Sequence, residues 1–152
     1  MFTIKVDTSK VVRRIEGIEK RIETLMPSIE NEVKSILRDA FAKIFAAEGI
    51  PRWRKLSPYT IRDRIAKGFG PGPILQRTGK LKRSYTGESR YGVWKTNRNS
   101  LTYTNLVPYA AFHERGTTRI PARHIIKGVL AKKEVRRAIV NAAHKQILKG
   151  GR

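Results

Sequence analysis

Hydrophobic residues recur every three or four positions through the first third of the chain, which is the spacing of one face of a helix or of two consecutive helices. Pro27 falls inside this pattern without shifting its phase. Because proline lacks an N–H and clashes with the preceding turn, it predicts a kink or a break, and Thr24 could then cap a second helical piece. We therefore predict two roughly collinear helical segments packed on one surface. The positions of the stripe are Val11, Ile15, Ile18, Ile22, Leu25, Ile29, Val33, Ile36, Ala40 and Ile44.

The pattern changes after residue 48. Residues 49–73 are rich in Gly and Pro and predict an irregular loop. Inside it, Ser57 followed by Pro58 has the sequence of an N-cap and a first helical position, so a short helix should begin there. A second short helix is expected from Thr78, again as the N-cap.

The remaining segments predict a hairpin and a final helix. Two β-prone runs, 91–94 and 101–107, flank turn-forming residues 97–100. Apolar spacing between 129 and 147 is helical, and Gly150-Gly151 should end that helix. With a short strand expected at residues 3–7, the chain reads as one α+β domain, 1–152. It should have a small, mostly antiparallel sheet packed against a long N-terminal helical region and a C-terminal helix.

Charge is unevenly distributed along this chain. The 33 Lys and Arg against 12 Asp and Glu give a net charge of +21. Residues 1–48 are nearly balanced at +1, whereas residues 49–152 carry +20 and contain four acids: Asp63, Glu88, Glu114 and Glu134. Such a field attracts phosphate backbones or acidic protein faces, so we expect a polyanionic or acidic partner.

Catalytic and metal-site patterns fail on inspection. There is no Cys, and no two of His113, His124 and His144 have the spacing of a helical zinc pair. The glycines of 68–72 are not followed by the Lys-Ser/Thr of a phosphate-binding loop. We interpret the chain as a protein without enzymatic activity, cofactor or metal. No run approaches the ~20 apolar residues of a membrane span, and the start of the chain has no signal-peptide pattern.

Three short segments in order carry a more specific signal. Residues 53–60 read Trp-Arg-Lys-Leu-Ser-Pro-Tyr-Thr and residues 74–84 read Ile-Leu-Gln-Arg-Thr-Gly-Lys-Leu-Lys-Arg-Ser. Residues 109–123 hold Tyr-Ala-Ala-Phe-His-Glu-Arg-Gly followed by Ile-Pro-Ala-Arg. Together they resemble the signature of the phage virion-morphogenesis proteins, the tail-completion family of Mu-like phages.

The resemblance implies a structural virion protein that assembles into a ring, expected to be a hexamer, at the end of the tail tube. There it would meet the head-connector proteins, with possible non-specific contact to the DNA in the channel. It implies the tail-neck region of a virion assembled in the host cytoplasm. Subunit or connector contacts are expected at Trp53, Arg54, Arg77, His113, Arg115, Arg119 and Arg123.

A sequence-independent nucleic-acid-binding protein is the alternative that the charge favours. Basic residues alternate with aromatics, as stacking platforms require, although no known DNA- or RNA-binding motif is present. The aromatics concerned are Trp53, Tyr59, Tyr85, Tyr91 and Trp94. The residues expected to face DNA or an acidic partner are Arg62, Arg64, Lys67, Lys132, Lys133, Arg136 and Arg137.

Overall fold

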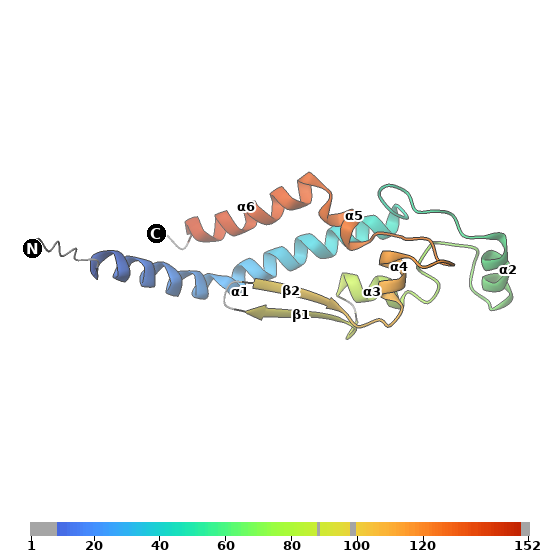
Figure 1. The fold of residues 1–152 in the computed structure, drawn as a ribbon, viewed down its shortest axis with the longest axis horizontal. Helices are drawn as coiled ribbons and strands as arrows, with labels where there is room; N and C mark the ends of the chain where they lie inside the picture. The colour runs from blue at the N-terminus through green and yellow to red at the C-terminus, as the bar shows by residue number, and fades with distance from the viewer. Residues whose placement is uncertain (1–8, 88, 98–99, 150–152) are drawn as a thin grey trace, which may run out of the picture.

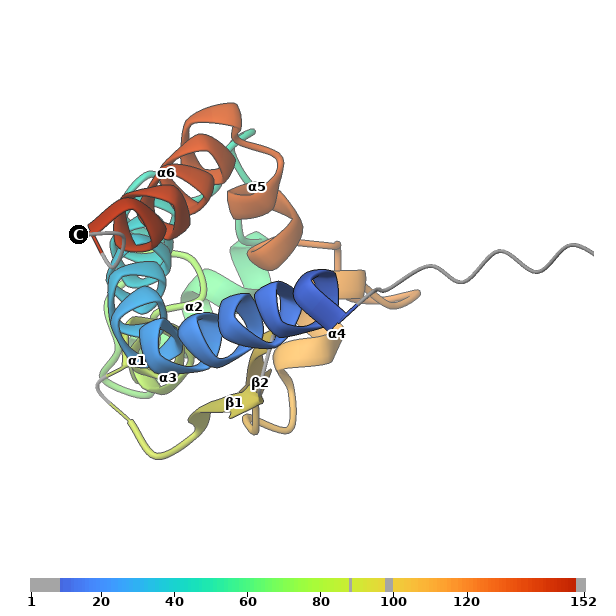
Figure 2. The same ribbon diagram turned by 90° about the vertical axis from the view of Figure 1, so that its left-hand side faces the viewer.

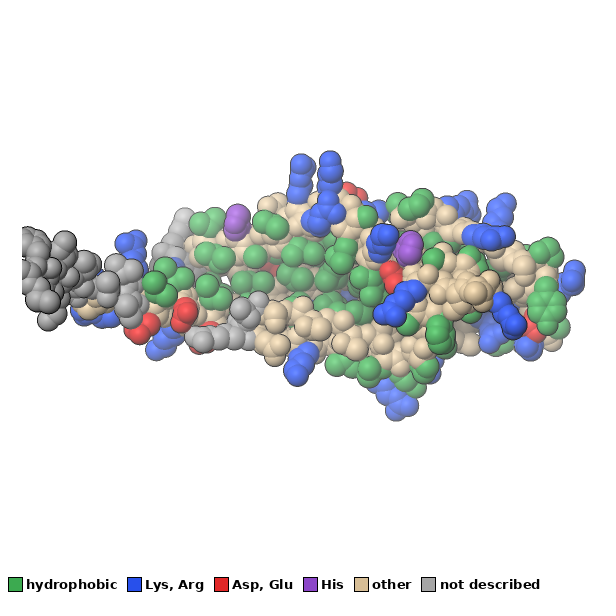
Figure 3. Space-filling model, in the orientation of Figure 1, with side chains coloured by type: hydrophobic (Ala, Val, Ile, Leu, Met, Phe, Trp, Pro, Cys, Tyr) green, Lys and Arg blue, Asp and Glu red, His purple; other side chains and the backbone are tan. Residues whose placement is uncertain are grey.

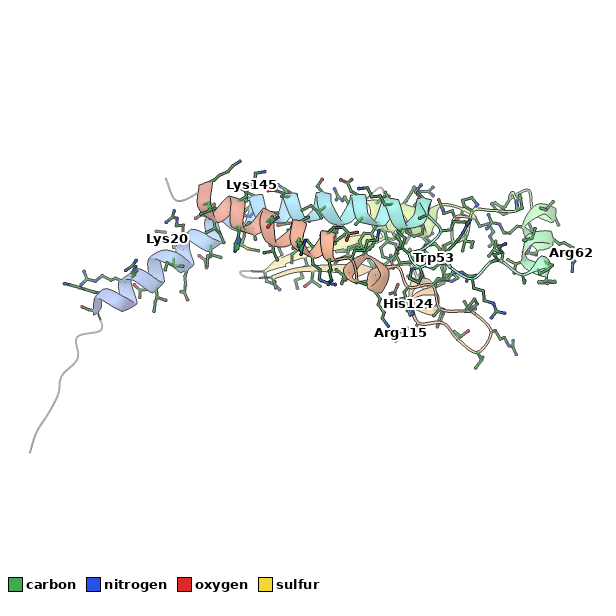
Figure 4. The ribbon with its side chains drawn as sticks, turned by 90° about the horizontal axis from the view of Figure 1, so that it is seen from above. Lys20, Trp53, Arg62, Arg115, His124 and Lys145 are labelled. Atoms are coloured by element: carbon green, nitrogen blue, oxygen red, sulfur yellow. The ribbon has the colours of Figure 1, made fainter. Side chains whose placement is uncertain are left out.

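The computed structural model describes residues 9–87, 89–97 and 100–149. Its dominant element is α1 (Ser9–Ala46), a single continuous helix with Pro27 inside it. The predicted break into two helical segments was therefore wrong, whereas the kink that Pro27 also predicted agrees with the bend of α1 (Figure 4). Thr24 does not cap a second piece, because its hydroxyl donates to the carbonyl of Lys20 at 3.0 Å. An internal proline and such back-bonding both bend helices, and the part of α1 that includes Lys20 is tilted away from the axis of the remainder (Figure 4).

The other helices gather around the second part of α1 (Figure 1). The C-terminal helix α6 (Lys133–Lys149) packs along α1, after the short α5 (Ile126–Leu130). Near the end of α6, Lys145 and Gln146 contact the carboxylate of Glu32 at 3.3 and 2.9 Å. Residues of α1 before Glu32 thus extend beyond the end of α6, which gives the molecule its elongated outline.

The predicted hairpin is confirmed. Strands β1 (Gly92–Asn97) and β2 (Ser100–Asn105) pair antiparallel, from Gly92 opposite Asn105 to Asn97 opposite Ser100. This two-stranded sheet lies on the other side of α1 from α6, as the end-on view shows (Figure 2). The predicted strand at residues 3–7 and the stop at Gly150-Gly151 lie outside the described residues.

Helix α3 (Lys80–Thr86) connects the hairpin to α1. The carbonyl of Ser84 accepts from the Tyr103 hydroxyl at 3.0 Å, and the Ser84 hydroxyl accepts from Asn105 at 2.9 Å. Gly92 is required at this contact because a Cβ there would lie 1.9 Å from the Ser84 carbonyl oxygen. The predicted helix is confirmed but its predicted cap is not: Gly79, with φ of 72°, occupies the N-cap position in place of Thr78.

The core forms where α1, α3, α5 and the loops meet. Phe45 and Tyr85 are at most 1% exposed, and their rings lie 5.8 Å apart. On the face seen in Figure 3, hydrophobic side chains follow α1 between α6 and the hairpin. The buried apolar residues are Phe41, Ile44, Phe45, Trp53, Ile74, Leu81, Tyr85, Val107, Ala110, Ile125, Val129, Val135 and Ala142.

The apolar stripe of α1 does not end where the core ends. Every side chain described between Arg13 and Thr24 is exposed. Ile15, Ile18 and Ile22 retain 52%, 53% and 39% of their surface. Within the described chain, the same helix face is therefore covered in one half of α1 and uncovered in the other.

Candidate interaction site: a basic cavity

Three separate parts of the chain line one cavity of about 1000 Å³. The first runs from Arg54 to Arg64, the second from Leu75 to Leu81 and the third from Tyr109 to Arg123. Each contains part of one of the three signature segments. Sequence segments that are up to about 50 residues apart therefore form a single site.

The first wall is built on α2 (Pro58–Ala66), as the sequence predicted. Ser57 is its N-cap, accepting from the Thr60 amide at 3.1 Å, and Pro58 begins the helix. Arg64 then ties the following loop to α2. Its guanidinium donates to the carbonyls of Gly70, Gly72 and Pro73 at 2.9–3.0 Å. The irregular stretch 49–73 is thus held by contacts within the chain.

The third wall is a reversal after α4 (Ala110–Arg115). Gly116, with φ of 78°, turns the chain, and a Cβ there would lie 2.8 Å from the amide nitrogen of Ala122. The amide of Arg123 donates to the His113 carbonyl at 2.7 Å. These contacts fold residues 117–123 back over α4 and fix the backbone at Arg123.

Arg123 is the most unusual side chain of the site. It is 6% exposed, and its side chain donates one long hydrogen bond, 3.4 Å, from Nη2 to the carbonyl of Arg54. Nε is buried without an acceptor among the described residues. Burial and the neighbouring Arg54 lower the pKa of Arg123 from its ordinary value, although a guanidinium stays protonated in proteins. The cavity wall therefore contains a buried positive charge, and no carboxylate of the described residues pairs with it.

The rest of the lining has the same sign. None of the described lining residues is Asp or Glu. Arg77 reaches Asp63, which is not a lining residue, at 3.8 Å, and Lys80 lies 4.0 Å from the centroid of the Tyr91 ring. The lining cations are Arg54, Lys55, Arg64, Arg77, Lys80, Arg119 and Arg123.

The carboxylates that could have neutralised the cavity are used elsewhere. Glu114 accepts from the amides of Ile125, Ile126 and Lys127 at 2.7–3.1 Å and so caps the start of α5. Asp63 pairs with Lys67 at 2.6 Å. The structural role of Glu114 was not predicted from the sequence, where its one signal is that acids are rare after residue 48.

His113 shares the environment of Arg123. Its Nδ1 is buried with no partner in the described structure, and its ring meets Tyr109 edge-on at 5.9 Å. Burial, followed by repulsion from Arg123, lowers the pKa of His113. Near neutral pH the imidazole is therefore uncharged and can donate or accept one hydrogen bond.

Five of the seven residues expected at an interface meet at this cavity: Arg54, Arg77, His113, Arg119 and Arg123. Trp53 does not face a partner, because it is 6% exposed and packs edge-on against Phe45 in the core. Arg123, expected at a subunit or connector contact, is 6% exposed. Arg115, labelled in Figure 4, is exposed and is not among the residues that line the cavity.

The second group of basic residues does not form one surface. Arg64 was expected to face a partner, but it is 4% exposed because its guanidinium is enclosed by loop carbonyls. Arg62 and Lys67 are exposed on and just after α2, at one tip of the molecule (Figure 4). The other members lie at the beginning of α6, well away from α2 (Figure 1); Lys133, Arg136 and Arg137 are exposed and Lys132 is half-buried.

The expected stacking aromatics are mostly packed inside. Trp53 and Tyr85 are buried, and Trp94 packs on Tyr103 with ring centroids 4.8 Å apart. Tyr59, at 73% exposure, is the exception. The arrangement therefore offers little base-stacking surface among the five residues.

Within the described residues, no group of three or more His, Cys, Asp or Glu could hold a metal ion. No helix in the same part of the chain is long and apolar enough to cross a membrane. Comparisons with protein-family models, with curated proteins and with solved structures found no match to this chain.

Proposed function

We propose that this protein is a structural component of a phage or phage-like virion, a ring subunit that completes the tail and joins it to the head connector. The observation that carries the proposal is the meeting of the three signature segments at one basic cavity. The three segments are spread over some 70 residues of sequence. When such distant segments meet in space, we expect them to serve one common site. An open, positively charged cavity without a reactive constellation among its described residues suits recognition of a partner better than chemistry.

The uncovered half of α1 supports assembly with further copies. Apolar side chains exposed in a row on one helix face are typical of surfaces that are covered in an oligomer. Ile15, Ile18 and Ile22 form such a row. A head-to-tail contact of this helix with a neighbouring subunit would close into a ring if the rotation allows it. A hexamer is our proposal on the basis of the family resemblance.

Tail-tube and head-connector proteins are the proposed further partners, in the neck of a virion assembled in the host cytoplasm. The charge of +20 in residues 49–152 would complement an acidic face of such a ring and could contact channel DNA non-specifically.

Electron microscopy of particles produced without this gene tests the proposal. We expect filled heads lying apart from tails, or tails of abnormal length, and restoration of joined particles when the gene is supplied in trans. Normally joined particles in the deletion would contradict the proposal.

A sequence-independent nucleic-acid-binding protein is the second candidate, favoured by the same charge. It predicts submicromolar binding of duplex DNA at low salt that collapses as salt rises. Normal particle assembly in the deletion, combined with such binding, would establish this alternative in place of the joining role.

A further inference from the structure

We propose that the basic cavity binds an acidic peptide segment of a partner protein and that Arg123, at its buried wall, receives a carboxylate of that segment. The inference rests on the proposed function for the class of occupant, a protein. The chemistry of the occupant is argued from the cavity itself.

The state of Arg123 favours an anion as its partner. Burying a charge without a partner is costly, and in proteins buried charges are therefore almost always paired. Arg123 is 6% exposed with Nε lacking an acceptor in the described structure, and the charge of Arg54 lies close enough to depress its pKa. A carboxylate placed against the guanidinium would supply the missing acceptor and offset the repulsion between the two arginines.

No described acid of the same chain serves this purpose. Glu114 is committed to three amides at the start of α5, and Asp63 to Lys67 and Arg77. Glu134 lies on α6 near Lys132, at 3.9 Å, outside the cavity lining. The counter-charge is therefore expected from another molecule.

The shape and the walls of the cavity favour a peptide over a nucleic acid. A volume of about 1000 Å³ is at the upper end of ordinary ligand pockets, so it can take several residues. Tyr109 is the one aromatic residue, apart from His113, in the described lining, which leaves little surface for stacking bases. Apolar side chains line the cavity together with the cations and can pack against the aliphatic parts of peptide side chains. They are Leu56, Leu75, Leu81 and Ile120.

Hexaglutamate is the direct probe, with binding measured by the anisotropy of a fluorescein-labelled peptide. The full chain should bind it, and Arg123→Met should weaken binding at least tenfold. Arg137→Met removes one exposed charge from α6 and leaves net charge matched, so it should change affinity less than twofold. Equal weakening in the two variants, or no binding by the unchanged protein, would overturn the proposal.

Two further measurements test peptide binding without changing a buried residue, so that a folding defect in Arg123→Met cannot explain the result. Arg54→Glu and Arg119→Glu change exposed lining residues that the core does not need, and both should weaken hexaglutamate binding by more than the same change at Arg137. A labelled oligothymidylate of six nucleotides and inorganic phosphate should not displace the peptide at equal charge concentration. Displacement by either would assign the cavity to a phosphate ligand and overturn the peptide assignment.

Failure of the acidic-peptide inference and failure of the proposed joining role give different experimental results. Absence of Arg123-dependent peptide binding, with separated heads and tails in the gene deletion, overturns the acidic-segment inference alone. Normally joined particles in the deletion overturn the joining role whatever the peptide result.

Discussion

Two buried arginines in this protein have opposite surroundings. Arg64 directs its guanidinium to three loop carbonyls, whereas Nε of Arg123 has no acceptor among the described residues. Carbonyl dipoles that converge on a guanidinium offset its lost hydration, so Arg64 is explained within the chain. The burial of Arg123 is not explained in this way by the described residues. The contrast separates Arg64, which stabilises the fold, from Arg123, which we propose binds a ligand.

Replacing Arg64 by Lys tests the structural role. A lysine ammonium is a point charge and cannot reproduce the planar fork that reaches Gly70, Gly72 and Pro73. We expect a loss of about 3 kcal/mol in the free energy of unfolding, since at least two charged hydrogen bonds disappear. Urea denaturation measures the loss, and hydrogen exchange at Phe69, whose amide donates to the Arg64 carbonyl, should accelerate.

The matched control for this change is Arg62→Lys on the exposed side of the same helix. It should alter stability by less than about 0.5 kcal/mol. Equal effects of the two substitutions would show that Arg64 does not organise the loop.

His113 makes stability depend on pH in a defined direction. Burial and Arg123 lower its pKa in the folded state, while the unfolded chain has the ordinary value of about 6.5. The unfolded state therefore binds more protons below pH 6.5. Stability should be fully present above that pH and decline as pH falls from it toward the folded-state pKa, by at most about 1.4 kcal/mol per pH unit for one proton.

Urea titrations at pH 7.5, 6.5 and 5.5 measure this decline. His113→Gln should flatten it, and His144→Gln, on the exposed part of α6, should preserve it. A decline that survives in His113→Gln would assign the pH dependence to other groups.

At the scale of elements, local patterns predicted most of the helices and the hairpin. The three-to-four spacing identified the α1 stripe, Ser57-Pro58 identified the start of α2, and two β-prone runs identified β1 and β2. The continuity of α1 through Pro27 was not predictable, because an internal proline can either end a helix or only bend it, and the spacing of apolar residues is the same in both cases.

The sequence predicted which residues belong to the candidate site, but it did not predict how they are arranged. Five interface residues were identified from the signature, yet the burial of Arg123 follows from the reversal at Gly116. Glu114 caps α5 from eleven or more positions away, and no local pattern marks such a contact. The sequence also could not show that loop carbonyls would enclose Arg64.

The role of the exposed apolar row on α1 can be tested by introducing one charged side chain into it. Ile18→Glu places a carboxylate in the row without touching the core, so the free energy of unfolding should change by less than about 0.5 kcal/mol. We expect assembly to be lost, because burying that charge in a helix contact is unfavourable. Sedimentation velocity of the purified protein measures the change.

Ile65→Glu on α2 is the matched control, since Ile65 and Ile18 have similar exposure, 56% and 53%. It should leave the oligomer unchanged. If both variants assemble like the unchanged protein, the row on α1 is not a subunit contact.

The whole molecule separates its two surface properties along its length. The exposed apolar row lies on the tilted, projecting part of α1, whereas the basic cavity lies toward the other end, among α2, α3 and α4 (Figure 1). A subunit with a self-association surface at one end and a charged recognition site at the other can bind a neighbour and a different protein at once. Because the two surfaces lie apart, one can be removed while the other is kept, which allows the joining role and the nucleic-acid-binding role to be distinguished by experiment.

Deleting residues 1–24 uses that separation. This segment holds six basic and four acidic residues, so the remaining chain keeps +19 of the +21 charge. Because its described side chains from Arg13 to Thr24 are exposed, the core should survive, with a Tm within a few degrees of the full chain. If the protein acts as an assembling ring subunit, the deletion variant should be monomeric in sedimentation and should fail to restore joined particles, while it retains hexaglutamate binding. If charge alone is what the protein contributes, as a nucleic-acid-binding role requires, the variant should function like the full chain, because the electrostatic attraction that drives such binding is nearly unchanged.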